Sequence, residues 1–167
     1  MKRILIISDT HIPSNALSLP EIIIEEAKKS DIIVHAGDLI TIDVIYELQS
    51  YAKEVLGVRG NIDKYDKRNN LPEKIITKIE KVNIGITHGS GAPWGIIKRI
   101  NKAFTEDELN LLDIIVFGHT HHPLIEKKGR ILYLNPGSPT DKIHAPYNSY
   151  IILNIEGTEA QPRLIKI

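Results

Sequence analysis

Short runs of apolar, β-branched residues recur along the first two-thirds of the chain, and each run is too short to form a helix. Between most of these runs lie segments with the amphipathic spacing of helices. Alternation of this kind is typical of an α/β architecture whose strands are buried on both faces. The predicted strands are residues 3–7, 31–35, 54–58, 82–87 and 113–117.

Three helices are expected between the predicted strands. Ser18 to Glu21 has the pattern of a capping box with a proline in the first turn, so the first helix should begin there. The second helix is predicted over residues 41–51 and the third over residues 94–104.

From about Leu124 the pattern changes to strands that are joined by tight turns, and no helix is predicted beyond that point. The chain has no internal repeat, no low-complexity tract and no linker, so residues 1–167 are interpreted as one domain. We expect two packed sheets with helices outside them. The predicted hairpins join residues 71–79 to 82–87, 124–127 to 130–134, and 150–155 to 162–167.

The composition excludes several classes of protein. Lys and Arg together number 21, as do Asp and Glu, and 42% of residues are hydrophobic. This balance is unlike that of a disordered chain, and it lacks the basic excess of proteins that bind extended nucleic acids. With no cysteine, disulfides and thiol nucleophiles are excluded, and any metal must be bound by His, Asp, Glu or Asn.

No apolar run approaches the length of about 20 residues that a membrane span requires. The first residues also lack the pattern of a secretory signal peptide. We therefore expect a cytoplasmic protein with no membrane partner.

Each of the five predicted strands is followed at once by polar residues that can bind metals. Ligands of open α/β sheets bind beyond the carboxyl ends of the strands, so these residues should converge on one rim. Asp9 and His11 stand two apart, as do His119 and His121, and such positions point to the same face of an extended segment. The candidate ligands are Asp9, His11, Asp38, Asn61, His88, His119 and His121.

Seven candidate ligands are more than one ion needs, and with one bridging carboxylate they suit two ions. Imidazole, carboxylate and amide groups without sulfur favour divalent transition metals over Ca²⁺ or Mg²⁺. We expect manganese first, with nickel, zinc, iron or cobalt as alternatives. Two such ions about 3.5–4 Å apart can activate a shared water and neutralise an anionic group, and phosphate ester hydrolysis needs both functions.

The ordered set of motifs resembles the calcineurin-like metallophosphoesterases, from Arg3 to about Ser138. The short length and the segment Asn135-Pro136-Gly137-Ser138 are most similar to the small YfcE-type phosphodiesterases. The resemblance implies a four-layer α/β/β/α sandwich of two mixed sheets with flanking helices, and a dinuclear metal site at the carboxyl ends of the strands. The motifs are Asp9-Thr10-His11, Gly37-Asp38, Gly60-Asn61-Ile62-Asp63, His88-Gly89 and Gly118-His119-Thr120-His121.

The resemblance also implies two metal positions that share a bridging carboxylate, that of Asp38. Many relatives have a histidine where this chain has Ile62. Isoleucine cannot exchange a proton, which weakens a monoesterase or protein-phosphatase interpretation more than a phosphodiesterase one. The implied ligands are Asp9, His11 and His121 for one metal, and Asn61, His88 and His119 for the other.

Two further residues are expected to support the reaction. Asn61 should hold the phosphoryl oxygens in addition to binding metal, and Asp63 should orient a neighbour by hydrogen bonding, although a turn-forming aspartate is an equally good interpretation. Ser138 is predicted to contact a substrate phosphate through its hydroxyl, and an ordinary turn would use the same residue.

The remaining histidines and the tryptophan have plainer interpretations. His35 is expected to be a core histidine, His122 a surface residue and His144 a solvated loop residue. Trp94 could stack on a base or an aromatic leaving group, but a tryptophan at a loop-to-helix junction more often packs at the edge of a core.

The leading hypothesis is a metal-dependent phosphodiesterase that hydrolyses small phosphodiesters by in-line attack of a metal-bridged hydroxide. The alternative is a protein-interaction scaffold, because His11-Ile12-Pro13 and Pro93-Trp94-Gly95 are similar to segments of the retromer subunit of the vacuolar sorting complex. A scaffold would have no need for the bridging Asp38. A nucleotide-binding domain is not supported, since no glycine-rich loop follows the first strand. A homo-oligomer is left open.

Overall fold

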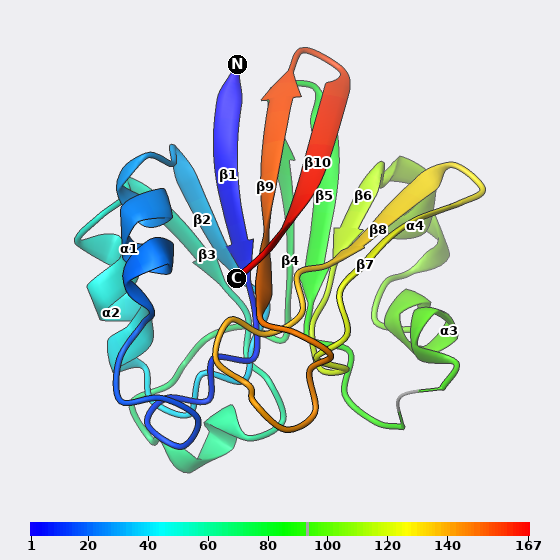
Figure 1. The fold of residues 1–167 in the computed structure, drawn as a ribbon. Helices are drawn as coiled ribbons and strands as arrows, with labels where there is room; N and C mark the ends of the chain where they lie inside the picture. Colours follow the sequence, from blue (N-terminus) through cyan, green and yellow to red (C-terminus); the bar gives the residue numbers. More distant parts are fainter. Residues whose placement is uncertain (93) are drawn as a thin grey trace.

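Two five-stranded sheets pack face to face in the computed structural model, which describes residues 1–92 and 94–167 (Figure 1). The strands are β1 (Lys2–Ile7), β2 (Ile32–His35), β3 (Glu54–Gly57), β4 (Lys74–Ile79), β5 (Val82–Thr87), β6 (Ile114–Val116), β7 (Leu124–Lys128), β8 (Ile131–Asn135), β9 (Ser149–Glu156) and β10 (Glu159–Lys166). The helices are α1 (Glu21–Lys28), α2 (Asp43–Gln49), α3 (Ile96–Asn101) and α4 (Glu106–Leu111), with a 3₁₀ turn at Asp63–Tyr65.

Both sheets are mixed. The first has the order β10-β9-β1-β2-β3, in which β1, β2 and β3 are parallel and β9 is antiparallel to both of its neighbours, β1 and β10. The second has the order β4-β5-β6-β8-β7, in which β5, β6 and β8 are parallel and the two edge strands are antiparallel to their neighbours. The three predicted hairpins are therefore present.

The core has three apolar clusters that separate four layers of secondary structure. Ile4 and Ile6 of β1 point between the sheets, where they share a cluster with Ile86 of β5. Leu5 and Ile7 alternate with them and pack outwards against α1 and α2. Burying one such side chain stabilises the fold by about 1.5–3 kcal/mol. Because both faces of β1 are covered, its sequence is an unbroken apolar run.

The outer face of the second sheet is covered by α3 and α4, whose apolar residues form the third cluster with those of β6 (Figure 1). This arrangement confirms the predicted α/β/β/α sandwich of two mixed sheets with flanking helices. Within the described residues, none of the helices has the length and apolar character that crossing a bilayer requires.

The predicted start of the first helix is wrong. Pro20 occupies the N-cap position with extended backbone dihedrals, and no side chain caps the helix, so Ser18 lies outside it. Because a residue before proline is pushed out of the helical region, Leu19 keeps Ser18 away from the first turn. A complete capping box instead joins Thr105 and Glu108 at the start of α4.

The helix α4 is absent from the sequence prediction. It has only six residues and no fully buried side chain, so its apolar periodicity is weak. The preceding helix, expected over residues 94–104, is confined to Ile96–Asn101.

Candidate metal centre

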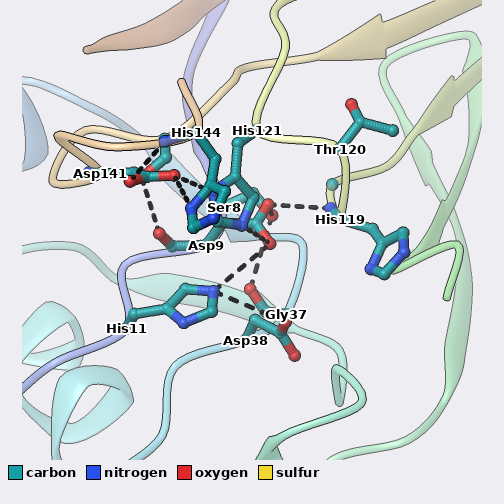
Figure 2. A network of polar contacts seen from close by, with 12 residues as sticks. Ser8, Asp9, His11, Gly37, Asp38, His119, Thr120, His121, Asp141 and His144 are labelled. Carbon is teal, nitrogen blue, oxygen red and sulfur yellow. Dashed lines mark hydrogen bonds and ion pairs between the residues drawn. The ribbon is translucent and has the colours of Figure 1, made fainter. Parts of the chain in front are cut away.

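The seven predicted ligands lie together in the loops that follow β1, β2, β3, β5 and β6, at one end of the sandwich (Figure 1). Figure 2 shows five of them: Asp9, His11, Asp38, His119 and His121. Three groups of possible metal-binding side chains form there, and within each group the ligand atoms lie within 4.8 Å of one another. The first is Asp9 with His11 and His121, and the second is Asp38 with His88 and His119. The third, His121 with Asp141 and His144, shares His121 with the first.

The Asp38 carboxylate belongs to the second group and also faces the first. Its Oδ2 is 3.6 Å from His11 Nε2 and 3.3 Å from His88 Nε2, so one oxygen faces a histidine of each of these two groups. The Asn61 amide oxygen lies 3.1 Å from His88 Nε2 and 3.1 Å from His119 Nδ1. Asn61 therefore lies beside two histidines of the second group, and its role as a metal ligand stays a prediction.

Two buried polar atoms of the centre have no hydrogen-bond partner among the described residues: Asp9 Oδ1 and His11 Nε2. The distance between them is 3.9 Å, too long for a hydrogen bond. A buried polar atom without a partner costs about 1–3 kcal/mol, and coordination of a cation would remove that cost. The donor set, with imidazole, carboxylate and amide groups, fits a divalent transition metal.

Three of the histidines are oriented by a hydrogen bond from the ring nitrogen that faces away from the centre. His88 Nδ1 donates to the carbonyl oxygen of Ala36 at 2.7 Å, and His119 Nε2 donates to that of Gly91. His121 Nδ1 donates to a carboxylate oxygen of Asp141 (Figure 2). Metal-binding histidines are commonly fixed in this way, because the outer bond selects the tautomer that presents the other nitrogen.

Asp141 is a functional candidate that sequence reasoning missed. Its carboxylate also accepts hydrogen bonds from the backbone of Ile143 and His144. Burial raises the pKa of this carboxyl, but its bonds with His121 and the backbone outweigh burial and lower the pKa to about 2. Asp141 is therefore an anionic support for His121.

The backbone of five ligands has a positive φ: 54° at Asp9, 44° at His11, 57° at Asp38, 71° at His119 and 57° at His121. The extended geometry assumed from the two-residue spacing is therefore wrong. Asp9 and His11 still meet in one group, whereas His119 and His121 belong to different groups. Non-glycine residues adopt this region at a cost of about 1–3 kcal/mol each, and such residues cluster at functional sites.

Asp63 lies beneath the centre with no exposed surface. Its carboxylate accepts four backbone N–H groups, from Asp38, Leu39, Ile40 and Gly60, at 2.7–2.9 Å. These bonds join the loop after β2 to the loop after β3. In this position Asp63 orients its neighbours, including Asp38, and does not face a substrate.

Ser138 also lies below the surface and has no exposed area. Its hydroxyl donates to the carbonyl oxygen of Asp9 at 2.7 Å and accepts the backbone N–H of Asp141 at 3.0 Å. The substrate contact predicted for Ser138 is therefore not seen. The hydroxyl instead links the loop that carries Asp9 to the loop that carries Asp141.

His35 is a buried core histidine, as expected, and His122 is exposed. The His144 side chain is 72% exposed, but its Nδ1 lies 3.5 Å from Asp141 and its ring centroid 6.0 Å from that of His121. His144 thus lies at the rim of the centre.

Trp94 is 77% exposed, so the prediction that it packs at a core edge is wrong. Pro93, of the predicted Pro93-Trp94-Gly95 similarity, lies outside the described residues.

The electrostatics of the centre are dominated by carboxylates and imidazoles in contact. Burial lowers the pKa of His88, but its contacts with Asp38 and Asp9 prevail and raise the pKa to about 9. Burial likewise opposes protonation of His121, and its contacts with Asp9 and Asp141 raise its pKa to about 9. The pKa of Asp9 is held far below its usual value against the effect of burial, mainly by His11 and His121. The centre therefore favours anionic carboxylates and a compensating cation.

A cavity of about 470 Å³ opens directly onto the centre. It is lined by His11, Asp38, Asn61 and Ile62, among others, and the ring of His144 stands at its edge. Its size suits a small molecule. Ile62 therefore faces the space in which a substrate would lie.

Comparison with known proteins gives consistent matches. Residues 1–158 match the family model described as the calcineurin-like phosphoesterase superfamily domain. A probable metallophosphoesterase of Methanocaldococcus jannaschii is 36% identical over 163 residues, which cover 97% of this chain and 80% of that protein.

Solved structures match over the whole chain. The solution NMR structure of a Thermotoga maritima protein is 36% identical, covers 100% of both chains and has a TM-score of 0.76. Vps29 from Entamoeba histolytica, solved in complex with Zn²⁺, is 24% identical, covers 98% of both chains and has a TM-score of 0.77. At that identity, the likeness to Vps29 shows the shared fold.

Proposed function

Because the chain belongs to the calcineurin-like phosphoesterase superfamily, a family of metal-dependent phosphoric ester hydrolases, we propose that it hydrolyses small phosphodiesters with two metal ions. The observation that carries this proposal is the position of Asp38. It forms one group with His88 and His119, and its Oδ2 also faces His11 of the other group. We propose manganese as the metal, with nickel, zinc, iron or cobalt as alternatives.

When bound, two such ions supply a nucleophile from a shared water and neutralise charge on the phosphoryl oxygens. The residues of this chain perform the binding and the orientation. Asp38 would bind between the ions, and Asp63 fixes its backbone. Asn61 directs its amide oxygen to the second group and lines the cavity, so its amide nitrogen can donate to a phosphoryl oxygen.

Ile62 supports a diester over a monoester as the substrate. It lines the cavity at the position where many relatives have a histidine, and it has no proton to give to a leaving group. A diester with a good leaving group needs this help less than a monoester with a poor one. The cytoplasmic location, the single domain of residues 1–167, a homo-oligomer and the exclusion of extended nucleic acid stay predictions.

The scaffold alternative has no specific support in the geometry. The shared fold with Vps29 is compatible with it, but the two ligand groups with their oriented histidines would serve no purpose in a pure scaffold.

The proposal predicts that Asp38→Ala abolishes hydrolysis of bis-p-nitrophenyl phosphate in the presence of Mn²⁺. We expect a loss of at least about 100-fold in kcat/KM, because the variant loses the ligand shared by both ions. Metal content measured by elemental analysis should fall from two ions per chain in the wild type.

The matched control is Asp107→Asn, an exposed carboxyl on α4, which should leave both readouts unchanged. Circular dichroism would show that both variants fold. Undiminished turnover in the Asp38→Ala variant would contradict the proposed reaction, and a folded protein that binds no metal after reconstitution would favour a scaffold.

A further inference from the structure

A second cavity, of about 460 Å³, lies beside the metal centre. Asn61 and His88, two ligands of the second group, line its inner wall, and Asn61 also lines the cavity over the centre. The two cavities therefore meet at Asn61. A small molecule bound at the metals can extend into the second cavity without leaving the protein surface.

The second cavity is rich in cationic side chains. Arg59, Lys64 and Arg99 line it, and Glu73 is its one acidic lining residue. Arg59 Nη2 lies 2.7 Å from Glu73 Oε1, so Glu73 neutralises one of the three cations. A formal excess of two positive charges is left next to the metals, in a chain whose formal net charge is zero. Such a local excess attracts an anionic group.

Arg99 is held in place for this role. Its Nε donates to the carbonyl oxygen of Ser90 at 3.3 Å, and its Nη1 donates to that of Trp94 at 2.8 Å. Its Nη2 is buried and has no hydrogen-bond partner among residues 1–92 and 94–167. A guanidinium that is already ordered loses little entropy when it binds a phosphate, and Nη2 is the donor that remains for a phosphate oxygen.

We propose that this cavity binds a second phosphate group of the substrate, so that the preferred substrate is a phosphodiester that also carries a terminal phosphate. This inference rests on the proposed function. The scissile diester lies at the metal centre, and the terminal phosphate lies between Arg99 and Lys64. Arg59, paired with Glu73, contributes less.

The test compares two substrates that differ only in the terminal phosphate: the p-nitrophenyl ester of thymidine 3′-phosphate with and without a 5′-phosphate. In the wild type, the 5′-phosphate should raise kcat/KM by about 10-fold, as charge-assisted hydrogen bonds warrant. Arg99→Gln should remove this preference, and Lys64→Gln should reduce it by about 3-fold. Neither variant should change hydrolysis of the ester without the 5′-phosphate by more than about 2-fold.

Lys64→Gln keeps the proposal testable if Arg99→Gln disturbs the backbone at Ser90 and Trp94, because Lys64 is exposed and forms no ion pair in the described residues. Lys98→Gln, an exposed lysine next to Arg99 on α3, is the matched control and should retain the full preference.

A second readout does not depend on turnover. Metal-free wild-type protein should bind thymidine 3′,5′-bisphosphate more tightly than thymidine 3′-phosphate in calorimetric titrations, and Lys64→Gln should reduce this difference in affinity by about 3-fold. Equal kcat/KM for the two esters, or a preference that survives in both variants, would overturn the inference and leave the diesterase intact. If no ester is hydrolysed, the proposed function fails, and the titrations alone decide whether the cavity binds the second phosphate.

Discussion

The imidazole of His35 is fully buried between the loops that carry the metal ligands. The backbone N–H of Gly37 donates to its Nδ1 at 3.2 Å, so its Nε2 carries the proton and donates to Thr10 Oγ1 at 3.1 Å. Both nitrogens are therefore satisfied by the neutral ring. Burial lowers the pKa of His35 to about 3.

This histidine should make the metal-free protein sensitive to mild acid. Because the folded-state pKa lies below the usual 6.5, the unfolded chain takes up a proton first as the pH falls. The stability from the neutral ring is complete above pH 6.5 and is lost between about pH 6.5 and 3, at about 1.4 kcal/mol per pH unit. Urea unfolding at several pH values would measure the slope.

His35→Gln should reduce this dependence of the free energy of unfolding on pH by the contribution of one proton, since glutamine does not titrate. The control His122→Gln should keep the wild-type slope, because His122 is exposed. Equal slopes for the wild type and His35→Gln would disprove this account of His35.

Asp141 should control metal affinity without contacting the metal. Asp141→Asn keeps the size of the side chain but removes the negative charge that orients His121. We expect a loss of about 10–100-fold in Mn²⁺ affinity, measured by competition with a chelator. Asp43→Asn, an exposed carboxyl on α2, serves as control; an Asp141→Asn variant with unchanged affinity would show that His121 is oriented by packing alone.

The sequence predicted which side chains gather at the centre because each follows a predicted strand closely, and polar residues of this kind are rare in such apolar surroundings. It could not predict Asp141, because a carboxyl in a polar loop has no such contrast. It also misassigned the geometry of Asp9 and His11, whose left-handed backbone depends on contacts with distant loops and not on local propensity.

At the scale of elements, the strands were predictable and the helix ends were not. Strands such as β1 and β5 are buried on both faces, so each is recognisable in the sequence as a short apolar run. Helix starts depend on one or two residues, and Ser18 and Thr105 are equally suitable as caps by type. The proline distinguishes them, because it keeps Leu19 out of the helical region and α1 begins only after Pro20.

The short helix α4 should depend on its capping box. The Thr105 hydroxyl accepts the backbone N–H of Glu108 at 3.2 Å, and the Glu108 carboxylate accepts the backbone N–H of Thr105 at 2.7 Å. Thr105→Ala should lower the free energy of unfolding by about 1 kcal/mol. Urea denaturation would measure it, with Thr158→Ala in the exposed β9–β10 turn as control. Equal stability of the two variants would indicate that packing alone holds α4.

At the scale of the whole molecule, the metal centre joins the two sheets. The first sheet contributes the loops with Asp9, Asp38 and Asn61, and the second contributes those with His88 and His119. A metal ion bound to both should therefore stabilise the sandwich as a unit. At a free Mn²⁺ concentration of 100 times the Kd, the free energy of unfolding should rise by about 2.7 kcal/mol.

Thermal unfolding with and without Mn²⁺ would measure this stabilisation, and a chelator should reverse it. The Asp38→Ala variant should show little response. A similar rise in that variant would mean that the ion binds elsewhere.

The position of β1 in the first sheet has a consequence for incomplete chains. β1 lies between β2 and β9, although β9 is close to the other end of the sequence. A fragment that stops before Ser149 would leave the apolar β1 with a free edge of backbone N–H and C=O groups at the centre of the sandwich. Such edges pair readily with other chains. Nascent chains should therefore tend to aggregate until the last hairpin is in place, and so should proteolysed forms that have lost it.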